Sequence, residues 1–280
     1  MSGINILNKK FGFNSFGAVA PFVCPDLDAT LFINAAGLTN LTEKQAICQL
    51  VQDLKAYNLW NALITIYPMV GSTPLSCSLN LKNVLQYQIG WYVLWAFTPT
   101  GAKPNGVNSW ANTGLNPAAT TSISAGNISM SYYSRTQSAI SSTEAGCQGL
   151  NIQNTYLIVK IPSDAPNDDY SRLFASKSMP SPIASSASYS LGFSTLIKPK
   201  NNVLQIYHDG VMVHAENVTV PTALPNYNIY LGATNVHGTA GGFSDKECAW
   251  FSVGRTLTTL ENATLYTIVQ NFQTTLSRQV

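Results

Sequence analysis

After Pro68 the sequence shows no helical periodicity for about 190 residues, and this stretch limits the fold more than any other feature. Short apolar runs alternate there with Gly, Pro, Asn and Ser. Many short strands separated by turn residues are typical of a two-sheet sandwich or a barrel. The predicted strands are Ser76–Leu81, Ile89–Phe97, Thr121–Ser124, Ser129–Ser134, Thr155–Ile161, Tyr189–Phe193, Val203–His208, Val211–Ala215, Ile229–Ala233 and Ala249–Val253.

The dipeptide Asp209-Gly210 is the strongest hairpin signal in the chain. It stands between two predicted strands, and both of its residues can adopt the positive φ that a two-residue turn requires. The sequence therefore predicts an antiparallel pair joined by a tight turn at this point.

Helices are predicted before the β-rich stretch. Asp26 can cap a helix over 27–36, and Gly37 can end it in the left-handed conformation. Thr42 begins a capping box for a second helix, and residues 59–67 are expected to add a further turn.

A last helix is predicted at the end of the chain, where Thr258 begins another capping box ahead of an apolar stripe at helical spacing. The expected organisation is an arm over residues 1–25, a helical module over 26–70 and a β-sandwich with its closing helix over 71–280. The arm would lie on a neighbouring subunit.

Charged residues make up only 10% of the chain, against about 25% in an ordinary soluble domain. Ser, Thr and Asn replace them, which suits a protein held in an assembly or one that meets neutral ligands such as sugars. The 15 basic residues are scattered singly, so we expect no nucleic-acid partner.

No apolar run approaches the roughly 18 residues of a membrane span, so we expect no membrane insertion.

The cysteines are odd in number and far apart in the sequence, without a C-x-x-C pair. This pattern argues against a zinc site and against a disulfide framework. Buried free thiols are expected instead, in a protein assembled in a reducing cytosol. The five cysteines are Cys24, Cys48, Cys77, Cys147 and Cys248.

Three segments together resemble the concanavalin A-like and laminin G-like lectin domains. Leu204–Val213 is similar to that family's Asp-Gly hairpin, Ile229–Ala233 to its next strand, and Leu257–Glu261 to its exit into a helix. The resemblance covers roughly residues 75–280. It implies a mainly β fold, an antiparallel two-sheet jelly-roll sandwich.

Other segments resemble virion proteins of tailed bacteriophages, among them Leu31–Gly37, Ser131–Arg135 and Ser244–Ala249. This resemblance implies a structural protein of a tail, fibre or head appendage. The chain would then be assembled in the host cytoplasm, reside in the virion, and have other virion proteins as partners, as a symmetric homo-oligomer.

Acidic residues are too few to suggest a catalytic site, because none occurs between Asp53 and Glu144. Asp245 and Glu247 would share one face of a strand at roughly 7 Å, a spacing compatible with glycoside hydrolysis. A solvated or ion-paired patch with Lys246 is the preferred explanation. We therefore expect no enzyme, and a polysaccharide depolymerase remains an alternative.

No metal site is predicted. His208 and His214 flank the Asp-Gly turn and could face each other across the hairpin, but no complete ligand set accompanies them. Lectin-like sandwiches often hold calcium, which is left open because Asp168, Asp169 and Asp209 form no recognisable loop.

Sugar binding has better chemical support. Aromatic faces stack on pyranose C–H surfaces, and amides both donate to and accept from hydroxyls. Trp110 lies among Asn105, Asn108 and Asn112 in a Gly/Pro-rich loop. The alternative is that Trp110 closes the edge of the sandwich.

Tyr132, Tyr133 and Arg135 complete the predicted carbohydrate site, with one tyrosine facing the core and the other outward. The alternative is that the tyrosines pack between subunits. The leading hypothesis is a virion component that presents a lectin-like sandwich to host or mucus glycans, and the second is a purely structural decoration or connector.

Overall fold

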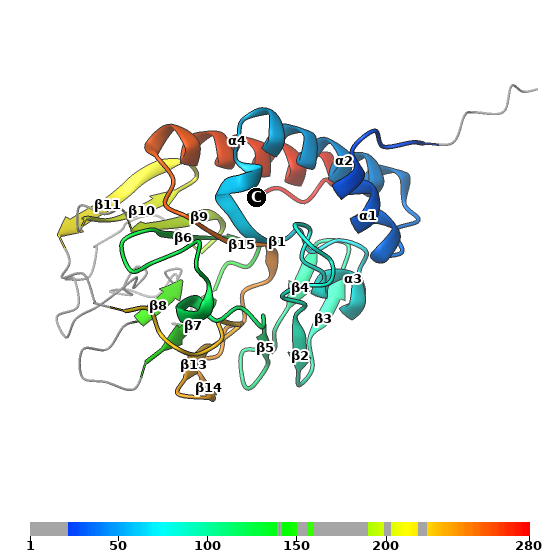
Figure 1. The fold of residues 1–280 in the computed structure, drawn as a ribbon. Coiled ribbons are helices and arrows are strands. Elements are labelled where there is room, and N and C mark those ends of the chain that lie inside the picture. Colours follow the sequence, from blue (N-terminus) through cyan, green and yellow to red (C-terminus); the bar gives the residue numbers. More distant parts are fainter. Residues whose placement is uncertain are drawn as a thin grey trace, which may run out of the picture.

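The computed structural model describes residues 22–138, 140, 142–149, 156–159, 190–198, 203–217 and 223–280. These residues form two sheets packed face to face, with a layer of helices over one of them (Figure 1). The predicted two-sheet β-sandwich with a C-terminal helix is thereby confirmed. Most of the predicted arm over 1–25, together with Asp168 and Asp169, lies outside the described residues.

The larger sheet has eight strands in the order β11-β10-β9-β6-β15-β4-β3, and β1 pairs with β15 beside this path. Its strands are β1 (Leu63–Tyr67), β3 (Ala96–Thr98), β4 (Gly101–Lys103), β6 (Ile128–Ser134), β9 (Gly192–Lys198), β10 (Val203–His208), β11 (Val211–Asn217) and β15 (Cys248–Gly254).

The smaller sheet has seven strands in the order β14-β13-β7-β12-β5-β2, and β8 pairs with β7. Its pairs are antiparallel except for the parallel pair of β13 with β7. Its strands are β2 (Gly90–Tyr92), β5 (Trp110–Asn112), β7 (Ala145–Gln148), β8 (Tyr156–Val159), β12 (Tyr230–Leu231), β13 (Thr234–Val236) and β14 (Thr239–Gly241).

The helices are α1 (Leu27–Ala35), α2 (Leu41–Ala56), α3 (Pro74–Ser78) and α4 (Thr259–Thr275), with short 3-10 turns at Trp60–Ala62 and Pro117–Ala119. Of these, α1, α2 and α4 form the layer over the eight-stranded sheet (Figure 1).

The structure has two hydrophobic cores because successive residues of the central strands point to opposite faces of the eight-stranded sheet. Tyr132 of β6 and Phe251 of β15 belong to the core between the sheets. Their neighbours Tyr133 and Trp250 belong to the core under the helices. The eight-stranded sheet is therefore buried on both faces.

The helix boundaries follow the predicted caps in two cases of three. The Asp26 side chain accepts hydrogen bonds at the start of α1, and Thr258 and Glu261 form the expected capping box of α4. The second helix is capped by Asn40 and not by Thr42, because the Asn40 side chain accepts from the Glu43 N–H. Asparagine is as good a cap as threonine or better.

The Asp-Gly hairpin is confirmed. β10 and β11 pair in antiparallel fashion, with Asp209 at φ 46° and Gly210 at φ 77° in the turn between them. A two-residue turn with both φ values positive matches the right-handed twist of the strands that it joins.

Four other predictions were wrong. Residues 63–67, expected to be helical, form β1 and pair with β15 in the sandwich. Residues 74–78 form α3, where the first strand was expected. The run Ile89–Phe97 is divided between the two sheets, because Val93 has φ 61° and the chain leaves β2 there. No strand forms at Thr121–Ser124, where Ser124 makes only an isolated bridge to Asn127.

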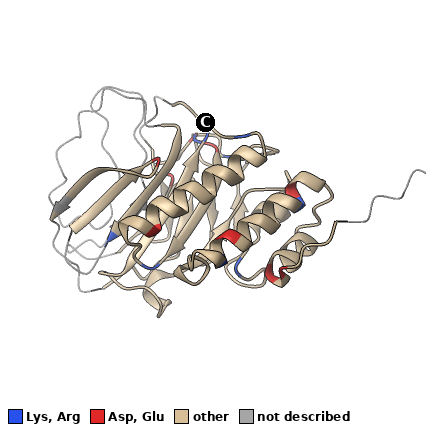
Figure 2. Ribbon diagram, turned by 90° about the horizontal axis from the view of Figure 1, so that it is seen from above, with Lys and Arg blue, Asp and Glu red and all other residues tan. Residues whose placement is uncertain are grey.

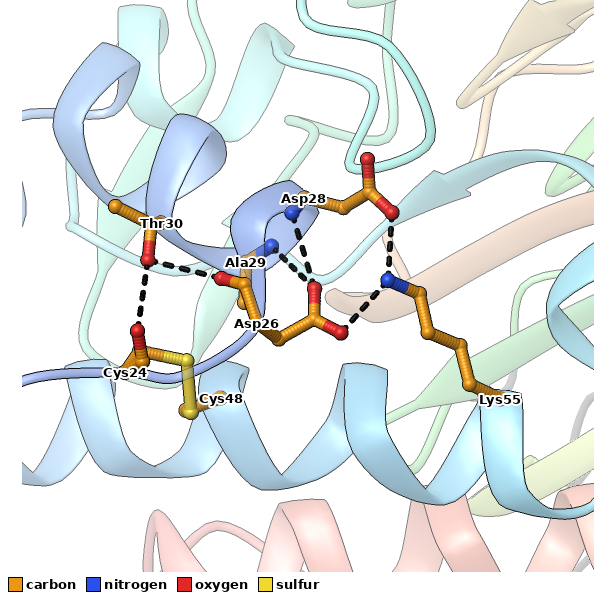
Figure 3. Close-up of a disulfide and its surroundings, with 7 residues drawn as sticks. All are labelled: Cys24, Asp26, Asp28, Ala29, Thr30, Cys48 and Lys55. Atoms are coloured by element: carbon orange, nitrogen blue, oxygen red, sulfur yellow. Dashed lines mark hydrogen bonds and ion pairs between the residues drawn. A yellow bond between two sulfur atoms is a disulfide. The ribbon is translucent and has the colours of Figure 1, made fainter.

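The expectation of free thiols throughout is corrected by a disulfide between Cys24 and Cys48. The segment before α1 lies against the middle of α2, which brings together two cysteines that are 24 residues apart in the sequence (Figure 3). Cys77, Cys147 and Cys248 are buried free thiols, as predicted.

Ion pairs reinforce the same junction. The Lys55 ammonium on α2 lies 2.7 Å from the Asp26 carboxylate and 2.6 Å from that of Asp28 (Figure 3). Charges elsewhere on the helical layer are few and dispersed (Figure 2). None of the described helices combines the length and apolar composition that a membrane span needs.

Candidate functional site: an aromatic platform on the seven-stranded sheet

Three aromatic side chains lie on the outer face of the seven-stranded sheet: Tyr92 of β2, Trp110 of β5 and Tyr230 of β12. Side chains alternate between the faces of a strand, and the residues that follow two of them, Ala111 and Leu231, belong to the core between the sheets. Tyr92, Trp110 and Tyr230 therefore point away from that core. The layer of α1, α2 and α4 lies on the opposite side of the molecule (Figure 1).

The three rings form a stack. The Tyr92 and Trp110 ring centroids are 3.9 Å apart with an interplanar angle of 3°, and the Trp110 and Tyr230 centroids are 4.4 Å apart at 28°. Both faces of Trp110 are therefore covered by tyrosine. The prediction that a sugar stacks on Trp110 itself is corrected, because neither face of its indole is free.

Tyr92 is the exposed end of the stack. Its side chain is 45% exposed, whereas Tyr230 at the other end is only 6% exposed. Burial and the neighbouring Tyr92 raise the pKa of Tyr230 above its ordinary value. Trp110 and Tyr230 thus fix the Tyr92 ring and leave its outward face to the solvent.

A gap in the row of side chains lies next to Tyr92. Gly90 is exposed, precedes it on β2, and is paired with Asn112 across the strands. A Cβ at Gly90 would lie 3.6 Å from the Tyr92 ring and 3.9 Å from the Asn112 carbonyl oxygen. We call Gly90, Tyr92, Trp110, Asn112 and Tyr230 the aromatic platform.

Asn112 supplies polar groups to the aromatic platform. Its Oδ1 accepts from the Gly114 N–H at 2.9 Å and from Asn228 Nδ2 at 3.2 Å. These bonds orient the amide and leave its Nδ2 group without an acceptor in the described part of the chain. An oriented amide beside an exposed aromatic ring is the combination that recognises a sugar hydroxyl next to an apolar sugar face.

Asn105 has a structural role in the neighbouring loop. Its Oδ1 accepts from three backbone N–H groups, those of Val107, Asn108 and Ser109, and its Nδ2 donates to Asn108 Oδ1 at 2.8 Å. Asn105 therefore holds the loop before β5 in shape and has little capacity left for a ligand.

The structure places Tyr132, Tyr133 and Arg135 away from the aromatic platform. Both tyrosines are completely buried, Tyr132 between the sheets and Tyr133 under the helices. The Arg135 guanidinium pairs with Glu247 at 3.2 Å. The predicted cluster is thus divided, because β6 belongs to the other sheet and both of its faces are covered.

The carboxylates considered for hydrolysis serve as contacts within the fold. Asp245 accepts from the Ser138 hydroxyl at 2.7 Å. Glu247 is 9% exposed and accepts from the hydroxyl of Thr100 at 2.6 Å, in addition to its ion pair with Arg135. Lys246 is fully buried.

The two histidines of the hairpin do not face each other. His214 is opposite Ile206, while His208 lies 3.3 Å from the Ser194 hydroxyl through Nδ1 and 3.5 Å from the Asp209 carboxylate through Nε2. Burial lowers the pKa of His208. The described residues contain no group of three or more His, Cys, Asp or Glu side chains that could hold a metal ion.

Sequence reasoning found Trp110 and Asn112 and missed Gly90, Tyr92 and Tyr230. The missing signal was the register: β2 ends at Tyr92, before the positive φ of Val93, and Tyr92 pairs with Trp110. The prediction of one continuous strand over Ile89–Phe97 gave no reason to pair Tyr92 with Trp110.

No family model matches the chain, and no curated protein matches it. Solved structures do match. A mutant of Trypanosoma rangeli sialidase that displays trans-sialidase activity superposes with a TM-score of 0.54 at 15% identity, over 83% of this chain and 40% of that chain. Trypanosoma rangeli sialidase in complex with 2,3-difluorosialic acid gives 0.50 at 15% identity, over 80% and 38%.

At such identities the likeness shows the fold alone, and the chain spans about 40% of the length of the first of these sialidases. The expectation that the chain is not an enzyme is nevertheless overturned. It relied on the scarcity of acidic residues, with none between Asp53 and Glu144, whereas the sandwich itself matches part of a sialidase. The fold therefore does not argue against catalysis.

Proposed function

We propose that the chain is a glycan-binding β-sandwich and that the aromatic platform is its binding surface. The observation that carries the proposal is the stack of three rings that ends on the 45% exposed Tyr92. A pyranose ring would lie on the free face of Tyr92, over the gap at Gly90, with a hydroxyl accepting from Asn112 Nδ2.

The physical support is preorganisation. Trp110 and Tyr230 already hold Tyr92, and Asn228 and Gly114 already orient Asn112, so little side-chain freedom is lost when a ligand binds. The low charge of the chain agrees with a neutral ligand. The likeness to a sialidase that was solved with a sialic acid derivative agrees with a sugar ligand, at the level of the fold.

The test is a glycan array followed by titration calorimetry on the strongest glycan, comparing the protein with Tyr92→Ala and Tyr57→Ala. Tyr57 is the matched control, because it is 61% exposed at the end of α2 in the helical layer. We expect Tyr92→Ala to raise Kd at least about tenfold, equal to about 1.4 kcal/mol, and Tyr57→Ala to leave it unchanged.

Two results would overturn the proposal: an array without any bound glycan, or a Tyr92→Ala protein that binds as tightly as the parent. The first result would favour the purely structural alternative.

The finer assignments remain proposals that rest on the sequence resemblance. They are a concanavalin A-like jelly-roll order of strands, a location in a bacteriophage tail, fibre or head appendage, and a homo-oligomer with other virion proteins as partners. Immunogold labelling of particles from an infected culture and mass determination of the purified chain would test location and stoichiometry.

A further inference from the structure

A second concave site lies at the edge of the sandwich, where the start of β1 meets two loops. Leu63 and Ile64 line one side, residues 82, 83, 86 and 87 the second, and residues 119–122 the third. The cavity volume is about 430 Å³, which is within the range of roughly 300–1,000 Å³ that holds small ligands.

Among the described residues, Lys82 is the only charged side chain that lines this groove. Its ammonium donates to the Trp60 carbonyl oxygen at 2.6 Å and lies 3.8 Å from the centroid of the Trp60 ring. No carboxylate of the described residues forms an ion pair with it. A half-buried cation with no ion-pair partner among the described residues, and only the more distant Asp28 attracting it, favours an anion beside it.

The rest of the lining is rich in amides and hydroxyls. Asn83 Oδ1 accepts from the Leu85 N–H, which leaves the Asn83 Nδ2 group to donate elsewhere. The side chains of Gln86, Thr121 and Ser122 also line the groove and are exposed. Such groups match a ligand that carries several hydroxyls.

We propose that this groove binds an acidic saccharide unit, whose carboxylate pairs with Lys82 and whose hydroxyls contact Asn83, Gln86 and Thr121. A neutral sugar would leave the cation unpaired, and a bare anion would leave the amides and hydroxyls unused. The proposal does not depend on the aromatic platform.

The test is calorimetric titration with glucuronate, galacturonate and N-acetylneuraminate, alongside glucose, galactose and inorganic phosphate. We expect at least one of the acids to bind at least tenfold more tightly than the neutral sugars and phosphate. Lys82→Met keeps the apolar stem of the side chain and should abolish this preference. Lys103→Met, which removes an exposed lysine of β4, should preserve it.

The pH dependence gives a second readout. Burial lowers the pKa of Lys82 to about 8, and among nearby charges Asp28 raises it while Lys55 lowers it. Binding of the acid should weaken as the pH rises through this value, because the neutral amine no longer attracts a carboxylate. Lys82→Met should have a flat profile.

The proposal is overturned if no acid binds better than the neutral sugars, or if phosphate binds as tightly as the best acid. It is also overturned if Lys82→Met keeps the preference while circular dichroism shows an intact fold.

Discussion

Among single residues, Gly90 is the position where the candidate glycan site can be closed without removing any of its groups. Its φ is not in the left-handed region, and a Cβ there would make only ordinary van der Waals contact. Gly90→Val should therefore be tolerated by the strand, where valine is favoured, while its side chain fills the gap beside Tyr92. We expect at least a tenfold loss of glycan affinity with no loss of thermal stability.

The control for this substitution is Gly241→Val. Gly241 lies on β14, at the other end of the same sheet, and a Cβ there would meet only Val236, at 3.9 Å. Titration of both variants separates closure of the gap from a general effect on the sheet. Equal affinity of Gly90→Val and the parent protein would argue that the sugar lies elsewhere.

Residue types alone could predict part of this site. A tryptophan flanked by asparagines pointed to Trp110 and Asn112, and both belong to the aromatic platform. Composition could not show that tyrosines cover both faces of Trp110, because Tyr92 and Tyr230 come from strands that are far apart in the sequence. Nor could it show that Tyr132 and Tyr133 are buried, since both faces of β6 are covered by other layers.

Among the elements, α4 depends on an ion pair at its first turn. The Arg255 guanidinium lies 2.7 Å from the Glu261 carboxylate, just after β15 ends, and joins the last strand to the helix. Hydrogen bonding from Arg255 lowers the pKa of Glu261 to about 2, although partial burial opposes the shift. The folded pKa is thus below the unfolded one, so the stabilisation is complete above about pH 4.5 and is lost as the pH falls toward 2.

The prediction is that Glu261→Gln lowers stability near pH 7 by about 1 kcal/mol, a modest value because solvent screens the pair. The difference in Tm between the variant and the parent should shrink as the pH falls from about 4.5 to 2, because the parent loses its carboxylate charge. Thermal melts from pH 2 to 7 measure this, and a difference that stays constant with pH would contradict the assignment.

At the level of elements, the sequence predicted most features that depend on neighbouring residues, and the exception is the cap of α2, which is Asn40 and not Thr42. The caps at Asp26 and Thr258 and the turn at Asp209-Gly210 involve residues within four positions of one another, and all three were correct. The strand at 63–67 was missed because it forms by pairing with β15, almost 190 residues later. No local pattern contains that partner.

Considered as a whole, the molecule has three layers, and a disulfide cross-links the helical layer internally. The cystine closes a loop of 24 residues between the segment before α1 and the middle of α2. We expect the double variant Cys24→Ser and Cys48→Ser to lose about 3 kcal/mol of unfolding free energy, mainly because its unfolded chain has more freedom. Urea unfolding with and without reductant measures the loss, and an unchanged midpoint in both comparisons would show that the bond contributes nothing.

The overall architecture was predictable to the level of two sheets and a closing helix. Turn residues at short intervals indicate many short strands, although the predicted strands differ from the observed ones in number and bounds. The low charge indicates a surface of neutral polar groups. The order of the strands was not predictable, since β2 and β3 follow each other in the chain yet lie in different sheets.

The five cysteines form one disulfide and three buried free thiols, and this difference has a practical use. Burial raises the pKa of the Cys77 thiol to about 12 and raises those of Cys147 and Cys248 further, so none of the three is a reactive thiolate near neutral pH. Mild reduction would thus offer a maleimide dye mainly one sulfur, that of the half-buried Cys24 in the helical layer, because Cys48 is only 5% exposed. A fluorophore attached there reports on the protein from the side opposite Tyr92, where it cannot obstruct a sugar.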